Sequence, residues 1–461
     1  MSNNTRSEGR SGLDVDVVVV GAGLCGLTAA DRIESAGYAV QVIEARNRIG
    51  GRTLSVRSDS TVVELGAQWV GQHHIRVRRM CAELGLTLIP VAPSGDRVTD
   101  IDGEAVRDHG RRLGALPGLL DQVQVGARMA WLTWRSSHRG SARLGELDQI
   151  SAERWIASGA WTKAGADYWR YIIESGTCAR ADEISIYEVA RQLASMGGLR
   201  GLATAEAFTI EDGTQRLAEG LADQLANPVM LGRPVESIRS APGADRVEVG
   251  CRRETLNARR VVVAVPAATL RSVEIDPSLG ATSPLGVDAP VAGRVVKQVI
   301  VYESRWWRQR GLSGEADTPG RCIDFMTDSS QADGPGVLVA LSTGPRADRM
   351  SRLNNADRER VTLAHINDVL GASPDPVPTI RFHDWIHDPH AQGGYAARRR
   401  IGGWATSVRE PEGCDRLVFA STETATQWRS YMEGAIDAGE QAAALIVGGL
   451  TAASTSTPLD A

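Results

Sequence analysis

Three glycines and one acidic residue near the start of the chain have the types and spacing that nucleotide binding requires. Gly21, Gly23 and Gly26 stand in the sequence GAGLCG, and Glu44 follows further along the chain. The first glycine permits a tight turn, the second lets backbone N–H groups approach a pyrophosphate, and the third lets a helix pack closely on a strand. The carboxylate of Glu44 can accept hydrogen bonds from both ribose hydroxyls and would repel a 2′-phosphate. These residues therefore predict a dinucleotide site that disfavours NADP.

The elements that must position these residues are predicted from the same region. Residues 16–20 read DVVVV, a continuous β-branched run that is typical of a strand buried on both faces. A helical stretch, LTAADRIESAGY, follows the glycines and ends at Gly37, and a second strand follows as AVQVIEA. This order is a complete βαβ unit, in which the phosphate lies at the positive end of the helix, where unsatisfied N–H groups point at it.

A second group of basic residues and glycines follows the predicted βαβ unit. Arg46 is followed by RIGGR, which contains Gly50, Gly51 and Arg52 and lies at the same end of the predicted sheet. A nicotinamide dehydrogenase does not need this second phosphate clamp. FAD does, because its pyrophosphate extends beneath the glycine loop. The nucleotide is therefore predicted to be FAD.

From this point the sequence resembles the flavin-containing monoamine oxidase family, in the order GAGLCGL, EAR, RIGGR and ELGAQWVG. Residues 417–443, LVFASTETATQWRSYMEGAIDAGEQAA, resemble the C-terminal motif of the family almost position by position. They indicate a strand, a polar turn and a helix beginning near Tyr431, whose N-terminal dipole would stabilise the anionic reduced flavin. The resemblance implies an α/β fold with a Rossmann-type, glutathione-reductase-like FAD-binding domain and an interleaved α+β substrate domain.

The resemblance also implies a set of cofactor contacts. The segment GAQW would lie along the edge of the flavin, Trp385 would pack near it, and Val235 would contribute backbone contacts on the adenine side. For Val235 a simple edge-strand role stays equally open. The residues expected to bind FAD are Gly21, Gly23, Gly26, Glu44, Ala45, Arg46, Gly50, Gly51, Arg52, Gly66, Ala67, Gln68, Trp69, Val235, Trp385, Thr422, Glu423 and Met432.

Three residues are expected to carry the chemistry. Tyr395 and Tyr431 match the pair that forms an aromatic cage on the open face of the flavin in the family, where it guides the amine to the reactive carbon. Lys297 stands in the apolar strand RVVKQVIVY, where a lysine is costly unless it has a partner. In the family a lysine at this position hydrogen-bonds a water at flavin N5 and promotes the reaction with oxygen. The catalytic set is therefore predicted to be Lys297, Tyr395 and Tyr431.

The predicted substrate pocket includes a short polar segment. Residues 174–178, ESGTC, would form part of the cavity wall, where they are smaller and more polar than in mammalian relatives. This difference favours a larger or more polar substrate, such as a cyclic or secondary amine. The expected pocket residues are Trp69, Ser175, Gly176, Tyr395 and Tyr431.

One position departs from the animal members of the family. They carry a cysteine immediately before the first cage tyrosine, through which the flavin is covalently attached, whereas this chain has Gly394 there. Cys414 does not match the attachment position. FAD is therefore expected to be bound non-covalently.

The implied reaction starts from a neutral primary or secondary amine, which gives a hydride equivalent to flavin N5. The imine then hydrolyses to an aldehyde or ketone, and oxygen is reduced to hydrogen peroxide. No side-chain base is required if the amine loses its proton before it binds. Activity is therefore expected to rise with pH until a tyrosine or lysine titrates.

Other readings stay open at this point. One is a polyamine oxidase, which prefers acidic groups in its tunnel, or an L-amino-acid oxidase, which needs an arginine to hold the substrate carboxylate. Arg180 or Arg398 could serve, but the sequence does not place either one. Another is an FAD-dependent desaturase or porphyrinogen-type oxidase, against which the tyrosine pair and Lys297 argue. The last is a flavin-binding protein without turnover.

The predicted domains are interleaved along the chain. The FAD-binding domain is expected at residues 14–89, 210–285 and 390–449, and the substrate-binding domain at 90–209 and 286–389. Residues 1–13 and 450–461 are expected to be disordered tails.

Composition limits the remaining function classes. The 461 residues carry a net charge of -5 and no long Lys/Arg run, which argues against a nucleic-acid binder. Six scattered cysteines without metal-ligand spacing indicate reduced thiols and no metal site. No signal-peptide core is present, nor a run of the roughly 18 apolar residues that a membrane helix needs. We expect a cytoplasmic protein with an amine and O2 as small-molecule partners and no membrane partner; a homodimer is left open.

Overall fold

The structure is a computed structural model. It describes residues 13–58, 61–91, 94–101, 104–108, 119–138, 145–240, 246–252, 254–279, 290–332, 334–395, 397–406 and 416–455.

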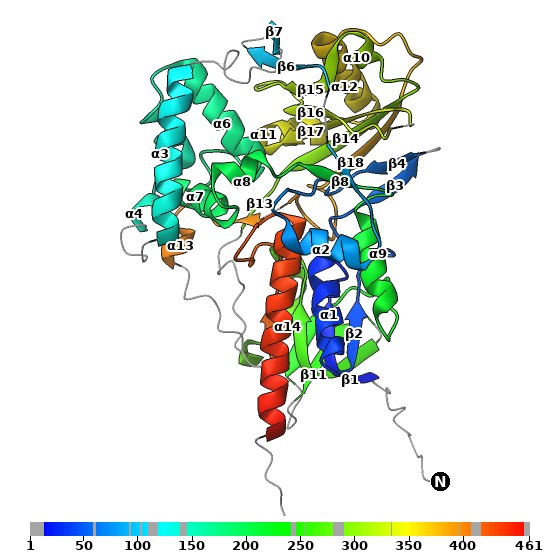
Figure 1. The fold of residues 1–461 in the computed structure, drawn as a ribbon. Helices are drawn as coiled ribbons and strands as arrows, with labels where there is room; N and C mark the ends of the chain where they lie inside the picture. The colour runs from blue at the N-terminus through cyan, green and yellow to red at the C-terminus, as the bar shows by residue number, and fades with distance from the viewer. Residues whose placement is uncertain are drawn as a thin grey trace, which may run out of the picture.

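The first sheet has seven strands in the order β12-β9-β10-β11-β1-β2, with β20 also paired to β11 (Figure 1). Strand β1 runs parallel to both β2 and β11, and β20 is parallel to β11. The predicted βαβ unit is therefore present, with β1 in the interior of this sheet and β2 at its edge. The strands are β1 (Leu13–Val20), β2 (Val40–Ile43), β9 (Ser237–Ser240), β10 (Val247–Cys251), β11 (Glu254–Val263), β12 (Glu274–Ile275) and β20 (Leu417–Phe419).

The second sheet also has seven strands, in the order β18-β14-β17-β16-β15-β6-β7. Its strand β14 is paired antiparallel on both sides, to β17 and β18, and is therefore an interior strand. The strands are β6 (Asp96–Ile101), β7 (Glu104–Asp108), β14 (Val295–Tyr302), β15 (Leu312–Asp317), β16 (Phe325–Asp328), β17 (Gly336–Thr343) and β18 (Thr379–Asp384). The helices next to it are α10 (Trp306–Gln309), α11 (Gly344–Ser351) and α12 (Asn355–Leu370).

A group of helices lies beside the second sheet, on the left of Figure 1. They share one hydrophobic cluster, to which α3, α5, α6 and α7 all contribute buried side chains. These helices are α3 (Leu119–His138), α4 (Gly145–Asp148), α5 (Ala152–Ala157), α6 (Lys163–Thr177), α7 (Ile186–Ser195) and α8 (Leu199–Ala203).

Short elements connect the two sheets and the helical group. They include three two-stranded sheets, β3–β4, β5–β8 and β13–β19. Their bounds are β3 (Ser55–Ser58), β4 (Thr61–Glu64), β5 (Leu88–Pro90), β8 (Phe208–Ile210), β13 (Val291–Ala292) and β19 (Ala397–Arg398). Further short elements are helix α13 (Gly403–Thr406) and the 3-10 helices Ala267–Ser272 and Pro277–Leu279.

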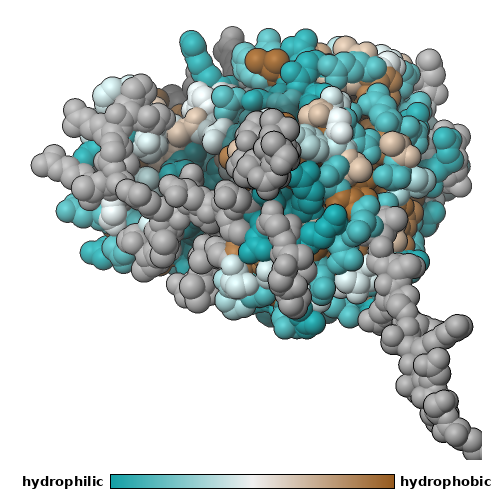
Figure 2. Space-filling view, turned by 90° about the horizontal axis from the view of Figure 1, so that it is seen from below, coloured by the Kyte–Doolittle hydropathy of each residue, from teal (hydrophilic) through white to brown (hydrophobic). Residues whose placement is uncertain are grey.

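The surface of the molecule is mainly hydrophilic on the face shown in Figure 2, with hydrophobic residues in separate patches between the polar ones. Within the described ranges, no helix has both the length and the apolar character needed to cross a membrane.

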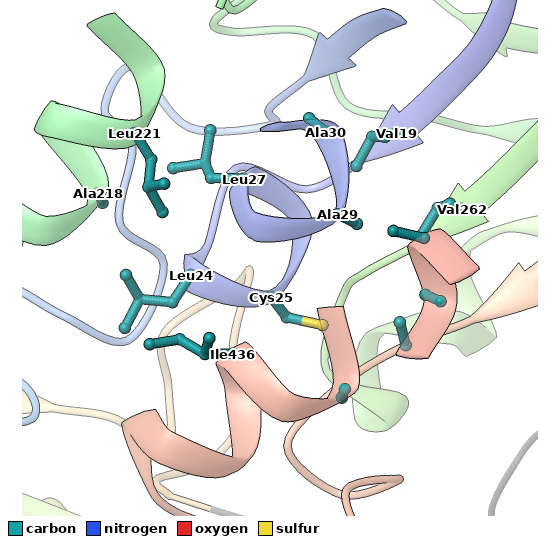
Figure 3. Close-up of a cluster of buried hydrophobic side chains, with 14 of the residues drawn as sticks. Val19, Leu24, Cys25, Leu27, Ala29, Ala30, Ala218, Leu221, Val262 and Ile436 are labelled. Atoms are coloured by element: carbon teal, nitrogen blue, oxygen red, sulfur yellow. The ribbon is translucent and has the colours of Figure 1, made fainter. Parts of the chain in front are cut away.

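The first sheet is buried because its strands are apolar on both faces. Val17 and Val19 face the cluster that contains α1 (Leu24–Ser35), α2 (Ile75–Glu83), α9 (Gln215–Gln224) and α14 (Met432–Thr455). Val18 and Val20 face the opposite cluster, as the alternation of side chains along a strand requires. Figure 3 shows α1 in the first cluster, with Leu24, Leu27 and Ala29 among side chains from neighbouring elements.

The structure corrects the predicted ends of the ordered chain. Strand β1 begins at Leu13, and α14 continues to Thr455, so the predicted tails at 1–13 and 450–461 overlap regular structure. The helix continues because Leu450 is fully buried against the first cluster and the Thr451 hydroxyl bonds to Val447 O at 2.9 Å. Residues 1–12 and 456–461 lie outside the described residues.

Candidate active site

The glycine loop lies between the carboxyl end of β1 and the start of α1. Gly21 has φ +103°, and an added Cβ would lie 2.8 Å from Ala264 O. At Gly26 an added Cβ would lie 2.0 Å from Gly21 O, so the helix packs directly on the turn. At Gly23, in contrast, the nearest atoms would be 4.0 Å away and belong to Gly50 and Gly51. Gly21 and Gly26 are therefore required by packing, whereas Gly23 borders open space.

Glu44 lies directly after β2 and below the glycine loop. One carboxylate oxygen accepts a hydrogen bond from the backbone N–H of Ala22 at 2.9 Å, and the other accepts one from Arg46 N–H at 2.8 Å. Ala45 lies between Glu44 and Arg46 in the sequence. The side chain is 5% exposed, so its position is fixed at the end of the strand.

The arginines of this region are held by partners from distant segments. Arg46 pairs with Asp388. Arg52 Nη1 is 2.9 Å from Glu423 Oε1 and also donates to Gly394 O at 3.1 Å. These contacts join the RIGGR segment to the position that precedes Tyr395 and to the turn after β20. A narrow cavity remains between them, lined in part by Arg52, Gly394 and Glu423.

This region fits a dinucleotide with a pyrophosphate. Helix α1 has Gly23 as its N-cap and no side-chain cap, so side chains leave its first N–H groups free to bind a phosphate. The open space at Gly23, between Gly50 and Gly51, lies where that phosphate would approach. The residues present are therefore those that would hold FAD.

Lys297 lies on the interior strand β14 and is 2% exposed. Its Nζ donates to Gly66 O and to Gln68 Oε1, each at 2.9 Å, and lies 5.4 Å from the ring centroid of Trp69. Burial lowers the pKa of Lys297 to about 8, and the nearby Glu64 carboxylate acts in the opposite direction. The side chain of Lys297 therefore does not extend to the surface.

The GAQW loop is fixed against the arginine segment. An added Cβ at Gly66 would lie 2.3 Å from Arg52 O, and Ala67 N–H donates to Arg52 O at 3.0 Å. The indole N–H of Trp385 donates to Leu65 O at 2.9 Å. Trp385 is buried in a cluster that also contains Trp69 and Tyr395.

Tyr395 lies beside the segment predicted to line the pocket. Its hydroxyl donates to Ser175 O at 3.5 Å, and the thiol of Cys178 adjoins it. Burial is the main reason that the pKa of Tyr395 is well above its ordinary value. Gly176 borders open space, because an added Cβ there would meet nothing within 4 Å.

Tyr431 lies just before α14, which begins at Met432. Its ring makes edge contacts with Trp428 and with His74, both with centroids 5.4 Å apart. Its backbone carbonyl accepts a hydrogen bond from Thr422 Oγ1 at 3.0 Å. Burial raises the pKa of Tyr431, and Tyr431 in turn adds to the raised pKa of Tyr395.

The structure also places three further residues that the sequence analysis considered, Val235, Arg180 and Arg398. Val235 is half-buried in the cluster beneath β1 and β2, so both of its readings stay predictions. Arg180 pairs with Asp182 on the surface. Arg398 is fully buried, where its Nε donates to Thr177 O at 3.4 Å and its Nη1 lies 3.9 Å from Glu188 Oε1. Within the described residues its two Nη atoms make no hydrogen bond.

The sequence reasoning missed several residues of the site. His74 is buried, packs against Trp428 and Tyr431, and has its pKa lowered to about 4 by burial. Glu64, which accepts hydrogen bonds from Ser55 and Thr214, is the carboxylate that acts most strongly on Lys297. Glu206 was also missed. Glu64 opens the ELGAQWVG segment, but nothing in that segment shows that its carboxylate acts on Lys297, which lies far along the chain. His74 and Glu206 stand in none of the motifs quoted above.

Comparison with known proteins identifies the family. Residues 24–447 match the family model for flavin containing amine oxidoreductases. The chain belongs to this family. It is therefore an FAD-dependent amine oxidase, which acts on an amine with oxygen as acceptor.

Among the relatives of this amine oxidase is the "Putative flavin-containing monoamine oxidase AofH" of Mycobacterium tuberculosis (strain ATCC 25618 / H37Rv). It is 31% identical over 450 residues, which cover 93% of this chain and 96% of the relative. Putrescine oxidase of Kocuria rosea is 30% identical, with 95% of this chain and 96% of the relative covered.

Solved structures agree with the fold. A structure of wild-type putrescine oxidase bound to putrescine has a TM-score of 0.84 and 26% identity, and the match covers 95% of this chain and 99% of that one. Cyclohexylamine oxidase from Brevibacterium oxydans IH-35A has a TM-score of 0.86 and 24% identity, with 95% and 100% covered. The predicted fold class is therefore confirmed.

Proposed function

We propose that this amine oxidase binds the neutral form of a primary or secondary amine between Tyr395 and Tyr431 and converts it to an imine, which hydrolyses to an aldehyde or ketone. Bound FAD would supply the two-electron acceptor and pass the electrons to oxygen, giving hydrogen peroxide. One observation carries the proposal. Lys297, Tyr395 and Tyr431 come from three distant segments, yet Lys297 Nζ lies 5.4 Å from the ring centroid of Trp69, which packs in one cluster with Tyr395. Tyr431 lies near enough to Tyr395 to contribute to its raised pKa.

The two tyrosines would form uncharged walls for the amine. Because burial raises the pKa of both hydroxyls, the rings stay neutral throughout the physiological range. Their π faces and the surrounding apolar groups favour a neutral amine over a desolvated ammonium. Deprotonation of the amine before binding then leaves no need for a side-chain base.

Lys297 would assist the reaction with oxygen. Gly66 O and Gln68 Oε1 accept two of the three hydrogen bonds that an ammonium can donate. Its third N–H has no acceptor among the described residues. We propose that this N–H holds the water that promotes oxygen reduction beside the flavin.

We propose that FAD is bound without a covalent bond, by the glycine loop, by residues 44–52 and 66–69, and by the turn before α14. The division into a cofactor domain (14–89, 210–285, 390–449) and a substrate domain (90–209, 286–389) is part of this proposal. Its support is that the strands of the first sheet fall in the first set of ranges and those of the second sheet in the second set.

The relatives support amines of modest size as substrates. They are a monoamine oxidase, a putrescine oxidase and a cyclohexylamine oxidase by name. We further propose a cytoplasmic location, because the cysteines of the described chain are all free thiols and four of them are buried. A homodimer stays a hypothesis for solution measurements.

The test is a peroxide assay of the purified holoenzyme on a panel of primary, secondary and cyclic amines. Tyr431→Phe keeps the aromatic wall and should retain most of kcat/KM, whereas Tyr431→Leu should lose about 10-fold. Tyr38→Leu is the matched control, because that tyrosine contacts Thr451 far from the site. Equal activity in the Tyr431 variants, or no peroxide from any amine, would contradict the proposal.

A further inference from the structure

His74 is a buried ring that contacts the proposed cage residue Tyr431 from a distant part of the chain. It is the N-cap residue of α2, whereas Tyr431 comes directly before α14. Their ring centroids are 5.4 Å apart, and the ring planes are inclined by 66°. A residue outside the predicted catalytic set therefore contacts one inside it.

The two cage tyrosines are held in different ways. The hydroxyl of Tyr395 is fixed by its hydrogen bond to Ser175 O at 3.5 Å. Among the described residues, no partner hydrogen-bonds the hydroxyl of Tyr431; Thr422 Oγ1 bonds only its backbone carbonyl, at 3.0 Å. The orientation of the Tyr431 ring therefore depends on the side chains that pack against it.

Two aromatic rings make edge contacts with the ring of Tyr431. Besides His74, these include Trp428, whose ring centroid is also 5.4 Å away and whose plane is inclined by 84°. His74 and Trp428 contact each other as well, with centroids 4.3 Å apart at 81°. Trp428 is itself anchored, because its backbone N–H donates to Ser195 O at 2.9 Å. The three rings thus touch in pairs, an arrangement that favours one orientation of each.

The ring of His74 is itself fixed in place. Its Nδ1 accepts a hydrogen bond from the backbone N–H of Gly71 at 2.8 Å, so its proton lies on Nε2. Its side chain is fully buried, and burial lowers the pKa to about 4, so the ring is neutral near pH 7. Gly71 leaves room for this ring, because an added Cβ would lie 2.8 Å from His74 Nε2. His74 is therefore a rigid support for a ring whose hydroxyl has no hydrogen bond.

We propose that His74 is a positioning residue for amine oxidation, because its ring fixes the orientation of Tyr431 and so holds the bound amine in its reactive orientation. The inference rests on the proposed function, in which the amine binds between Tyr395 and Tyr431. His74 acts through Tyr431 and does not need to touch the amine. Without this support the ring of Tyr431 gains freedom, so the rate of flavin reduction falls more than the affinity for the amine does.

The test follows flavin reduction in the holoenzyme by stopped flow without oxygen, over a range of concentrations of benzylamine, butylamine and cyclohexylamine. This separates the limiting rate from the dissociation constant of the amine. His74→Leu should lower the limiting rate about 10-fold and change the dissociation constant less than about 2-fold. His74→Phe keeps an aromatic edge and should stay within about 3-fold of the wild-type rate. His73→Leu is the matched control at an exposed neighbour and should change neither quantity.

A double variant shows whether the effect passes through Tyr431. In a Tyr431→Leu background, His74→Leu should cost less than about 2-fold further, because the ring that it supports is already absent. Gly71→Ala displaces the His74 ring without removing it, and it should give the same loss and the same dependence on Tyr431 even if His74→Leu does not fold.

Two outcomes would overturn the positioning role and leave the proposed function standing. One is a loss in His74→Leu that multiplies the loss in Tyr431→Leu. The other is a limiting rate per bound flavin that stays unchanged in His74→Leu or Gly71→Ala. If Tyr431→Leu is itself reduced as fast as wild type, the proposed cage fails and this inference fails with it.

Discussion

Lys297 is one of only two lysines in a chain that is rich in arginine. The other, Lys163, has a side chain that is 86% exposed, whereas Lys297 is 2% exposed in the middle of a sheet. An ammonium can lose its proton near neutral pH when burial lowers its pKa, and an arginine cannot. The choice of lysine at the buried position therefore gives the site a cation whose charge depends on pH.

This leads to a prediction for the oxidative half-reaction. Since the pKa of Lys297 is lowered to about 8, its ammonium is present below that pH and is lost as the pH rises through it. The rate of flavin reoxidation should therefore fall above pH 8, and Lys297→Met should be about 100-fold slower with no such pH dependence. Stopped-flow mixing of the reduced enzyme with oxygen measures this.

The matched control is Lys163→Met, which should behave as wild type. The reductive half-reaction, measured without oxygen, should instead rise with pH because the neutral fraction of the amine grows. The two tyrosines do not limit that rise near neutrality, since burial raises both of their pKa values. A reoxidation rate that is the same in Lys297→Met and wild type would contradict the assigned role.

At the scale of elements, the glycines in the turn from β1 into α1 have two different roles: some are required by packing within the protein, and one leaves room for a ligand. Gly21 and Gly26 are required by contacts within the protein, because added Cβ atoms would lie 2.8 Å and 2.0 Å from backbone oxygens. Gly23 has an ordinary extended backbone, with φ -80° and ψ 174°, and open space beside it. Packing within the protein therefore does not require a glycine at position 23, and the absence of a side chain there leaves room for a ligand.

We therefore predict different outcomes for two alanine substitutions. Gly23→Ala should leave the thermal stability of the apoprotein unchanged or slightly higher, since alanine adopts this backbone without strain, but should weaken FAD binding by about 10-fold or more. Gly26→Ala should destabilise the apoprotein itself. Thermal unfolding of the apoprotein and fluorescence titration with FAD separate the two effects; an unstable Gly23→Ala apoprotein would contradict this interpretation.

At the scale of the whole molecule, the site is assembled where the two sheets and the helical group meet. Lys297 comes from the second sheet, Tyr431 from the start of α14, and the wall at Ser175 from the end of α6. The Arg52–Glu423 pair closes the arrangement across the chain, at 2.9 Å. The segments expected to hold FAD are therefore joined by contacts between distant parts of the chain.

The mode of attachment can be tested directly. Acid precipitation of the wild-type holoenzyme should release the yellow chromophore into the supernatant, because Gly394 offers no thiol. A cysteine does not fit there without a change in its neighbour, since an added Cβ would lie 2.4 Å from Val295 Cγ2. Gly394→Cys should therefore lower the melting temperature, and Val295→Ala should restore it. Colour that stays with the wild-type pellet would contradict non-covalent binding.

The sequence by itself determined those features of this protein that depend only on residues close together in the chain. A β-branched strand, a GAGLCG turn and a helix form a phosphate-binding unit within about thirty residues, so type and spacing suffice. The acid at Glu44 and the helix that begins after Tyr431 are fixed in the same way. These features predicted FAD and the fold class, and both are confirmed. The predicted tails were wrong at both ends, because β1 begins at Leu13 and burial of Leu450 extends α14 beyond the point where its polarity rises.

The tertiary structure alone decided which charges are satisfied and which face the substrate. Arg398, read as a possible carboxylate clamp, is enclosed with Glu188, and Arg52 meets Glu423 from the opposite end of the chain. Glu206 is an ordinary acid in a turn when only its neighbours in sequence are considered. Folding places its carboxylate where it acts on the pKa of Lys297, and burial raises its own pKa to about 7. Desolvation and pairing depend on every segment that packs around a group, so no local pattern can encode them.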